Sequence, residues 1–233
     1  ADLLVGAGSV DTSWHIGAPA GQYAGVVEPD SLLTQEWDPN FQHVSKQSSY
    51  ALQTRLLAKA IVIKGKNAAP IALVKQDAYL SQDYLSRRVA AILKRDGSAV
   101  TYDNLMISST HDHSAPYYTT PSAGVWVFED VMDLRQFEYQ ARALAAAVED
   151  AEADLRPAKM SATQIEFPDF QSNIQGPGVA DDGSPAGYPR EENAHTLAVV
   201  RFDELTTGTP SGTCLHFHHP RRGAAGSTTG SAR

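Results

Sequence analysis

The stretch Leu105 to Tyr118 reads LMISSTHDHSAPYY, and its interpretation decides how the rest of the chain is understood. It begins as a mostly apolar run, typical of a strand buried on both faces, which we expect over residues 104–110. His111, Asp112 and His113 follow directly, before a Ser, an Ala and a Pro. Polar residues at a strand end form either an ordinary turn or a binding site. The stretch alone leaves both open.

Strands and helices are predicted to alternate around this stretch. Residues 58–65 and 70–77 indicate two strands joined by a tight turn, a hairpin. A helix is predicted over 82–95 because its apolar positions recur with helical spacing: Leu85, Val89, Ile92 and Leu93. A longer helix is predicted over 131–155, ended by Pro157, with one apolar face made by Leu134, Phe137, Ala141, Leu144, Ala145 and Val148.

Three further strands are predicted towards the C-terminal end, over residues 158–167, 195–204 and 211–219. The first alternates in polarity as strands do, and the last two are joined by a turn at 207–210. The sequence therefore predicts an α/β or α+β domain of at least six strands, with mixed sheets and flanking helices. It does not give the strand order.

Composition excludes some classes of function. The 233 residues carry a net charge of −8 and no Lys/Arg cluster, so nucleic acid is not expected as a partner. No apolar run approaches the ~18 residues that a membrane span needs. Cys214 is the single cysteine, which excludes an internal disulfide. The first residue is Ala, which fits a mature exported protein but also recombinant expression, so the compartment stays open.

Two long segments and the last residues lack periodicity. Residues 17–50 and 171–193 are rich in Gly, Pro and Ser, and such long loops in compact domains are usually functional or disordered. After Pro220 the chain reads RRGAAGSTTGSAR, and the patterning stops. We expect a domain over 1–220 and a low-complexity tail over 221–233. The tail is either flexible or the result of truncation or out-of-frame translation, and we favour the second explanation.

The histidines gather in two places. His111 and His113 close the strand described above, and His216, His218 and His219 close the last strand as LHFHHP. Residues i and i+2 of a strand share a face, so each pair can face one pocket. Imidazole is the commonest metal ligand, and histidines from two strand ends suit zinc. Spacing alone does not separate this from hydrogen-bonded strand-end residues.

Other sequence patterns say less about function. GAGSVD lacks the third glycine of a dinucleotide-binding loop, and no G-x-S-x-G elbow or P-loop occurs. Four aromatic residues after the H-x-H sequence form core or loop packing, or else wall an apolar substrate groove: Tyr117, Tyr118, Trp126 and Phe128. Asp112 would point away from the histidines on a continued strand, whereas a turn at Ser114 would bring it inward.

STHDHSAPYY resembles the T-H-x-H-S-x-P motif of the neutral/alkaline, non-lysosomal ceramidases. The likeness extends along the chain to Pro220. GAGSVDTSWHIG resembles the opening of that family, and LQTRLLAKAIVIKG with IALVKQDAYL resembles its next two strands. HTLAVVRFDE and SGTCLHFHHP resemble the strand pair that ends in a metal-binding His.

The resemblance implies the incomplete N-terminal part of a larger catalytic domain. In that family Zn²⁺ is held by two histidines, a glutamate and a tyrosine. The matching histidines here are His111 and His219, while His113 would lie beside the metal and contact the substrate amide. The implied reaction is zinc-dependent hydrolysis of ceramide to sphingosine and a fatty acid. His113 would stabilise the developing oxyanion or handle a proton.

The sequence also departs from the family. Gln175 stands where the family has a substrate-contacting Arg, and the Glu and Tyr ligands come from later parts of the family's chain. We therefore expect this chain alone to be a poor enzyme or inactive. The alternatives are a non-catalytic fragment and a metal-dependent hydrolase of another lipid amide or ester. The resemblance further implies a ceramide-like lipid partner, allows peripheral contact with a membrane or lipid surface, and favours secretion. The oligomeric state stays open.

Overall fold

The computed structural model describes residues 2–18, 49, 51–116, 121, 132–166, 178–179, 185–186 and 196–217. The chain divides into two compact units between Pro157 and Ala158. Within the described ranges, the first unit contains helices and strands, whereas the second contains strands alone. None of the helices in these ranges combines the length and apolarity needed to cross a membrane.

The first unit is built on a mixed sheet in the order β4-β3-β2-β1. Its strands are β1 (Leu3–Asp11), β2 (Leu57–Gly65), β3 (Ile71–Gln76) and β4 (Leu105–Ser109). The β1–β2 and β2–β3 pairs are antiparallel, whereas β3 and β4 are parallel. The β2–β3 pair confirms the predicted hairpin. The first residues of the following strand, β5 (Arg156–Glu166), pair with Leu4 and Val5 of β1. The predicted mixed α/β class is confirmed.

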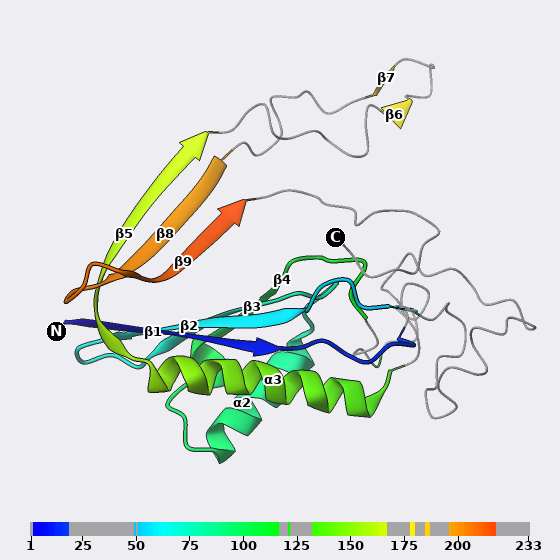
Figure 1. Cartoon of the computed structure of the whole chain (residues 1–233), viewed down its shortest axis with the longest axis horizontal. Helices are drawn as coiled ribbons and strands as arrows, with labels where there is room; N and C mark the ends of the chain where they lie inside the picture. The colour runs from blue at the N-terminus through cyan, green and yellow to red at the C-terminus, as the bar shows by residue number, and fades with distance from the viewer. Residues whose placement is uncertain are drawn as a thin grey trace, which may run out of the picture. The chain divides into compact units, whose positions relative to one another are not determined.

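Two helices, α2 (Asp83–Arg95) and α3 (Leu134–Ala153), lie on the same face of this sheet (Figure 1). Parallel strands need a crossover, and α2 with the short 3₁₀ helix at Tyr102–Asn104 supplies it between β3 and β4. The core lies between helices and sheet. Its fully buried members are small or branched and include Ala58, Ala60, Val62, Val74, Leu85, Val89, Leu144, Val148 and Ala151.

Strand β1 was not predicted, and its glycines explain both the omission and the packing. Gly6 and Gly8 lower strand propensity, so the segment does not read as a strand. A Cβ on Gly6 would lie 2.0 Å from the Ala151 carbonyl oxygen, and one on Gly8 would lie 2.1 Å from that of Ala147. The backbone of α3 therefore approaches β1 more closely than any side chain permits.

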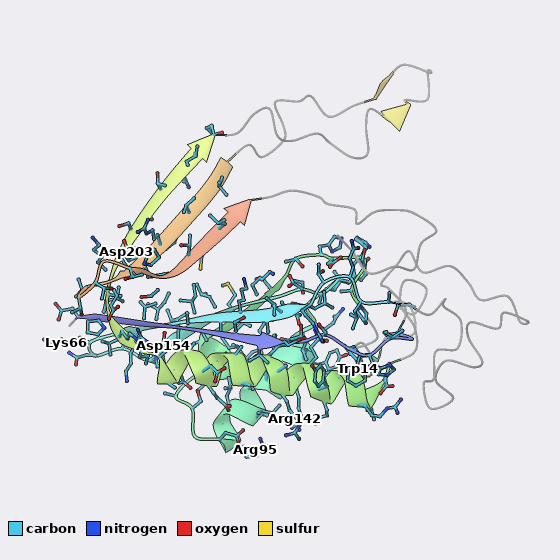
Figure 2. All side chains as sticks on the ribbon, in the orientation of Figure 1. Trp14, Lys66, Arg95, Arg142, Asp154 and Asp203 are labelled. Atoms are coloured by element: carbon cyan, nitrogen blue, oxygen red, sulfur yellow. The ribbon has the colours of Figure 1, made fainter. Side chains whose placement is uncertain are left out.

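Asp133 and Asp154 mark the two ends of α3. The Asp133 carboxylate accepts the backbone N–H groups of Arg135 and Gln136 as an N-cap. Asp154, labelled in Figure 2, follows the last turn and accepts the N–H of Ala7 on β1 at 3.3 Å. Leu134 is 69% exposed, so its predicted place on the buried face was wrong. An apolar stripe identifies one face of a helix, but it does not show whether another element covers every residue on that face.

Strand β4 was predicted to be buried on both faces, and this was wrong. Leu105 and Ile107 pack against the core, whereas Met106 between them is 64% exposed. The helices cover one face of the sheet in the described part of the chain, so alternate residues of an apolar strand stay accessible. An apolar run of five residues does not reveal this difference.

The second unit contains antiparallel strands in the order β5-β8-β9. β8 (Thr196–Glu204) pairs with β5 and with β9 (Pro210–Phe217), which confirms the three predicted strands. Gly208 closes the β8–β9 turn with φ at 71°, a conformation that glycine adopts without strain. A small ladder of β6 (Gly178–Val179) and β7 (Pro185–Ala186) lies within the segment predicted as a loop.

Candidate functional site

The candidate site lies where the parallel strands β3 and β4 end. Their last residues, Gln76 and Ser109, are register partners. A loop follows each strand, and backbone hydrogen bonds join the two loops: Thr110 donates to the Gln76 carbonyl at 3.0 Å and Asp112 to the Ala78 carbonyl at 3.1 Å. The carboxyl ends of parallel strands are the usual place for ligand sites in α/β sheets.

Three rings meet in these loops. The centroids of the His111 and His113 rings are 4.5 Å apart and nearly perpendicular, at 82°. The Tyr79 ring from the β3 loop lies 4.8 Å from His111 and 4.5 Å from His113. Sequence reasoning did not single out Tyr79. Finding it required the strand order, because only the β3–β4 pairing brings its loop beside the H-x-H sequence.

The two predicted histidines are brought together, although not by the expected geometry. The prediction assumed that His111 and His113 lie on one strand and so share a face, but β4 ends before them, at Ser109. His111 instead has φ at 60°, in the left-handed region, and is the one described non-glycine residue with a positive φ. The chain then turns at His113 and Ser114. A reversal of the backbone therefore replaces the i, i+2 relationship.

The His111 imidazole is held in one orientation. Its Nδ1 lies 2.9 Å from the backbone carbonyl oxygen of Tyr79. A carbonyl oxygen only accepts, so Nδ1 donates its proton in this contact, and in the neutral imidazole the lone pair is then on Nε2. The residue is exposed, whereas His113 is only 3% exposed. A histidine whose second ring nitrogen bonds a backbone carbonyl is the usual arrangement of a metal ligand.

Asp112 stabilises the turn. Its carboxylate accepts the backbone N–H of Ser114 at 2.8 Å, an Asx turn. Burial raises the pKa of the Asp112 carboxyl, although the Ser114 bond opposes this, and the nearby Asp77 charge adds to the increase. The predicted turn at Ser114 is present, and the carboxylate is used by the backbone there.

The described residues do not form a complete set of metal ligands. They contain no group of three or more His, Cys, Asp or Glu side chains that could hold a metal. Catalytic zinc sites typically use three protein ligands, so the two imidazoles would need others. The predicted ligand His219 lies outside the described residues, two positions after the end of β9. The metal roles of His111 and His219 and the catalytic role of His113 stay predictions.

A small pocket adjoins the H-x-H turn. Ser114 and Pro116 line it together with residues that include Trp14, Leu52 and Leu56. Trp14, labelled in Figure 2, also packs against Tyr139 of α3 with ring centroids 5.1 Å apart. The cavity is about 20 Å³, enough for a water molecule but not for an acyl chain.

Several residues named in the sequence analysis lie outside the described ranges. They are Tyr117, Tyr118, Trp126 and Phe128, Gln175, and His218 with His219. The backbone of His216 is described as part of β9. The predicted lipid groove and the substituted arginine position are therefore untested.

Comparisons with known proteins agree on one family. Residues 43–208 match the model of the neutral/alkaline non-lysosomal ceramidase, N-terminal. A neutral ceramidase of Drosophila pseudoobscura pseudoobscura is 28% identical over an alignment of 178 residues that covers 69% of this chain and 23% of that protein.

Solved structures resemble the fold. The neutral ceramidase of Pseudomonas aeruginosa matches 92% of this chain with 31% of its own, at a TM-score of 0.67 and 20% identity. A ceramidase complexed with C2 also covers 92% of this chain, using 30% of its own length. Its TM-score is 0.66 and its sequence identity is 20%. This chain thus spans less than a third of each relative. The family model covers well over half of the chain, which belongs to the neutral/alkaline non-lysosomal ceramidase family.

Proposed function

We propose that this chain contributes the N-terminal, metal-binding part of a zinc-dependent amidohydrolase that cleaves the N-acyl amide of ceramide into a sphingoid base and a fatty acid. The observation that carries the proposal is the His111 ring, exposed and oriented through Nδ1 by the Tyr79 carbonyl, beside the buried His113. The neutral ceramidase relatives support the substrate class.

We assign His111 and His113 different roles because their surroundings differ. His111 is exposed, and its Nδ1 is held by the Tyr79 carbonyl, which leaves Nε2 for a metal and suits a ligand. His113 is buried against Tyr79 and His111, where it can stabilise the oxyanion that forms on the amide carbonyl or transfer a proton to the leaving amine. Bound zinc would polarise the carbonyl and lower the pKa of a water ligand.

Further ligands must complete this site. His219 is the proposed second metal-binding histidine, and the family resemblance implies a glutamate and a tyrosine as well. Because the two described imidazoles fall short of the usual three protein ligands, we propose weak zinc binding and little or no hydrolysis by these 233 residues alone. Secretion stays an expectation from the resemblance.

The test is hydrolysis of ceramide by the protein as its source organism produces it. We expect fatty-acid release that stops on chelation and returns with zinc. His111→Ala should lower kcat/KM by about a hundredfold or more, since a metal ligand is lost. His195→Ala serves as the matched control, because neither predicted histidine group assigns that residue a role.

Two results would overturn the proposal: equal turnover of ceramide after chelation, or full activity of His111→Ala. A panel in which the amide is replaced by an ester, or ceramide by another N-acyl lipid, separates ceramide hydrolysis from the alternative of another lipid hydrolase. Preference for the other lipid by tenfold or more in kcat/KM would favour that alternative.

A further inference from the structure

A chain of buried polar side chains runs through the first unit to the candidate site. Gln76 at the end of β3 is fully buried, and Gln136 and Gln140 on α3 are 3% and 6% exposed. Ser81 and Ser109 complete the chain from the β3 loop and the end of β4. Buried amides cost several kcal/mol unless they are hydrogen-bonded, so their position in an apolar core has to be accounted for.

The Gln76 amide is the centre of this network, and all of its groups are used. Its Nε2 donates to Ser81 Oγ at 2.9 Å and to Ser109 Oγ at 3.1 Å. Its Oε1 accepts from Gln140 Nε2 at 2.6 Å. The two serine hydroxyls are 2.8 Å apart. Both strand ends are therefore tied to one side chain, and that side chain is tied to α3.

The network continues along α3 from Gln140 to Gln136. Gln136 Nε2 donates to Gln140 Oε1 at 3.1 Å, one turn along α3. This bond leaves Gln140 Nε2 directed at Gln76. The three amides therefore form one continuous series of hydrogen bonds from α3 to the end of β3. At the helix end, Gln136 Oε1 is buried without a hydrogen-bond partner among the described residues, whereas the hydrogen bonds of Gln140 and Gln76 restrict those side chains more than apolar packing would.

The same residue also holds the loop that carries the histidines. The Gln76 carbonyl accepts the N–H of Thr110, and the next loop bond joins Asp112 to Ala78. The Tyr79 carbonyl that orients His111 lies three residues after Gln76. His111 has φ at 60°, which costs a non-glycine residue roughly 1–2 kcal/mol and has to be imposed by its surroundings.

We propose that the Gln140–Gln76 amide pair, with Ser81 and Ser109, is a positioning device that sets the tautomer and orientation of His111. It acts through the paired ends of β3 and β4: the network fixes the β3 loop, the loop fixes the Tyr79 carbonyl, and the carbonyl holds the Nδ1 proton. The inference rests on the proposed function, since a fixed Nε2 lone pair matters for binding a metal.

The test uses Gln140→Met, which removes the amide on α3 while keeping the side chain's length. Histidine ¹⁵N spectra of the metal-free, full 233-residue chain, with the His111 signals identified by His111→Asn, report the tautomer. We expect the Nδ1–H form in the unaltered chain and a mixture of both forms in Gln140→Met. Zinc affinity should fall about tenfold, as for other residues that orient a metal ligand.

Val148→Ala is the matched control. Val148 is fully buried on the same helix, so this change lowers stability without touching the amides. Its His111 spectrum should match that of the unaltered chain. A Gln140→Met protein that folds and keeps both the tautomer and the zinc affinity would overturn the proposal, because the network would then serve stability alone.

A second pair covers the case in which Gln140→Met does not fold. Ser109→Ala removes one hydroxyl of the network, whereas Ser109→Thr keeps it and suits a strand. The tautomer mixture should arise in the alanine variant and be absent from the threonine variant, and equal spectra would contradict the proposal. Because these spectra need neither metal nor substrate, a shifted tautomer in a protein without ceramide hydrolysis would separate this inference from the proposed function.

Discussion

At the residue scale, His111 combines an unusual backbone with an oriented ring. Its φ of 60° lies in the left-handed region, where a side chain approaches the following carbonyl. Its Nδ1 reaches the Tyr79 carbonyl from that conformation at 2.9 Å. Strained residues of this kind persist where the surrounding structure holds them, and they concentrate at functional sites.

The backbone conformation predicts which substitutions His111 tolerates. Asn adopts a positive φ readily, whereas β-branched Val does so at high cost. We expect His111→Val to be less stable than His111→Asn by about 1–2 kcal/mol. Urea unfolding of the two variants, both of which lack the imidazole, measures the difference. Equal midpoints and slopes would show that the left-handed conformation is not kept in solution.

The histidine pair was predictable from sequence, and its surroundings were not. H-x-H with Ser and Pro after a strand indicated the candidate site, and the two rings do lie together, with centroids 4.5 Å apart. A one-residue spacing places two side chains near each other in many backbone conformations. Tyr79 and Gln76 gave no such signal. Their roles depend on the pairing of β3 with β4 over residues far apart in the chain, which no local pattern contains.

At the element scale, the contact of α3 with β1 depends on two glycines. A Cβ at Gly8 would overlap the Ala147 carbonyl oxygen at 2.1 Å and would come within 2.9 Å of the Ala151 nitrogen. These are backbone atoms of a helix, so they cannot move aside singly. The helix would have to shift as a unit away from the sheet.

Gly8→Ala is therefore expected to destabilise the first unit by about 3 kcal/mol, the upper part of the range for an overpacked core. Gly65→Ala is the matched control, because a Cβ there meets only the Ala68 side chain at 3.5 Å, an ordinary contact. Thermal unfolding followed by circular dichroism compares them. A Gly8→Ala protein as stable as Gly65→Ala would contradict the described packing.

The remaining elements were predicted well where periodicity was strong. Helices α2 and α3 follow from their apolar stripes, and the strands of the second unit follow from alternation and turns. The failures share one physical cause. Leu134 and Met106 are exposed because burial depends on which neighbour covers a face, and a single segment's pattern does not contain its neighbour.

At the scale of the whole molecule, the first unit brings the candidate site residues together at one edge of its sheet. Strands β3 and β4, joined by α2, deliver His111, His113 and Tyr79 to one edge. The chain spans 23% of its Drosophila relative and about a third of the solved ceramidase chains. The family was predictable because the H-x-H-S motif kept its order with the weaker matches. The proposed ligand set stays untested, because His219 lies outside the described residues and those residues contain no group of three or more possible metal ligands.

The measurement that tests the central claim most directly is calorimetric titration of zinc into this chain, purified without a tag, beside His111→Ala and His195→Ala. We predict one weak site in the unaltered chain, an affinity at least tenfold lower in His111→Ala, and no change in His195→Ala. Equal affinity of the unaltered chain and His111→Ala would contradict the assignment of His111 as a metal ligand.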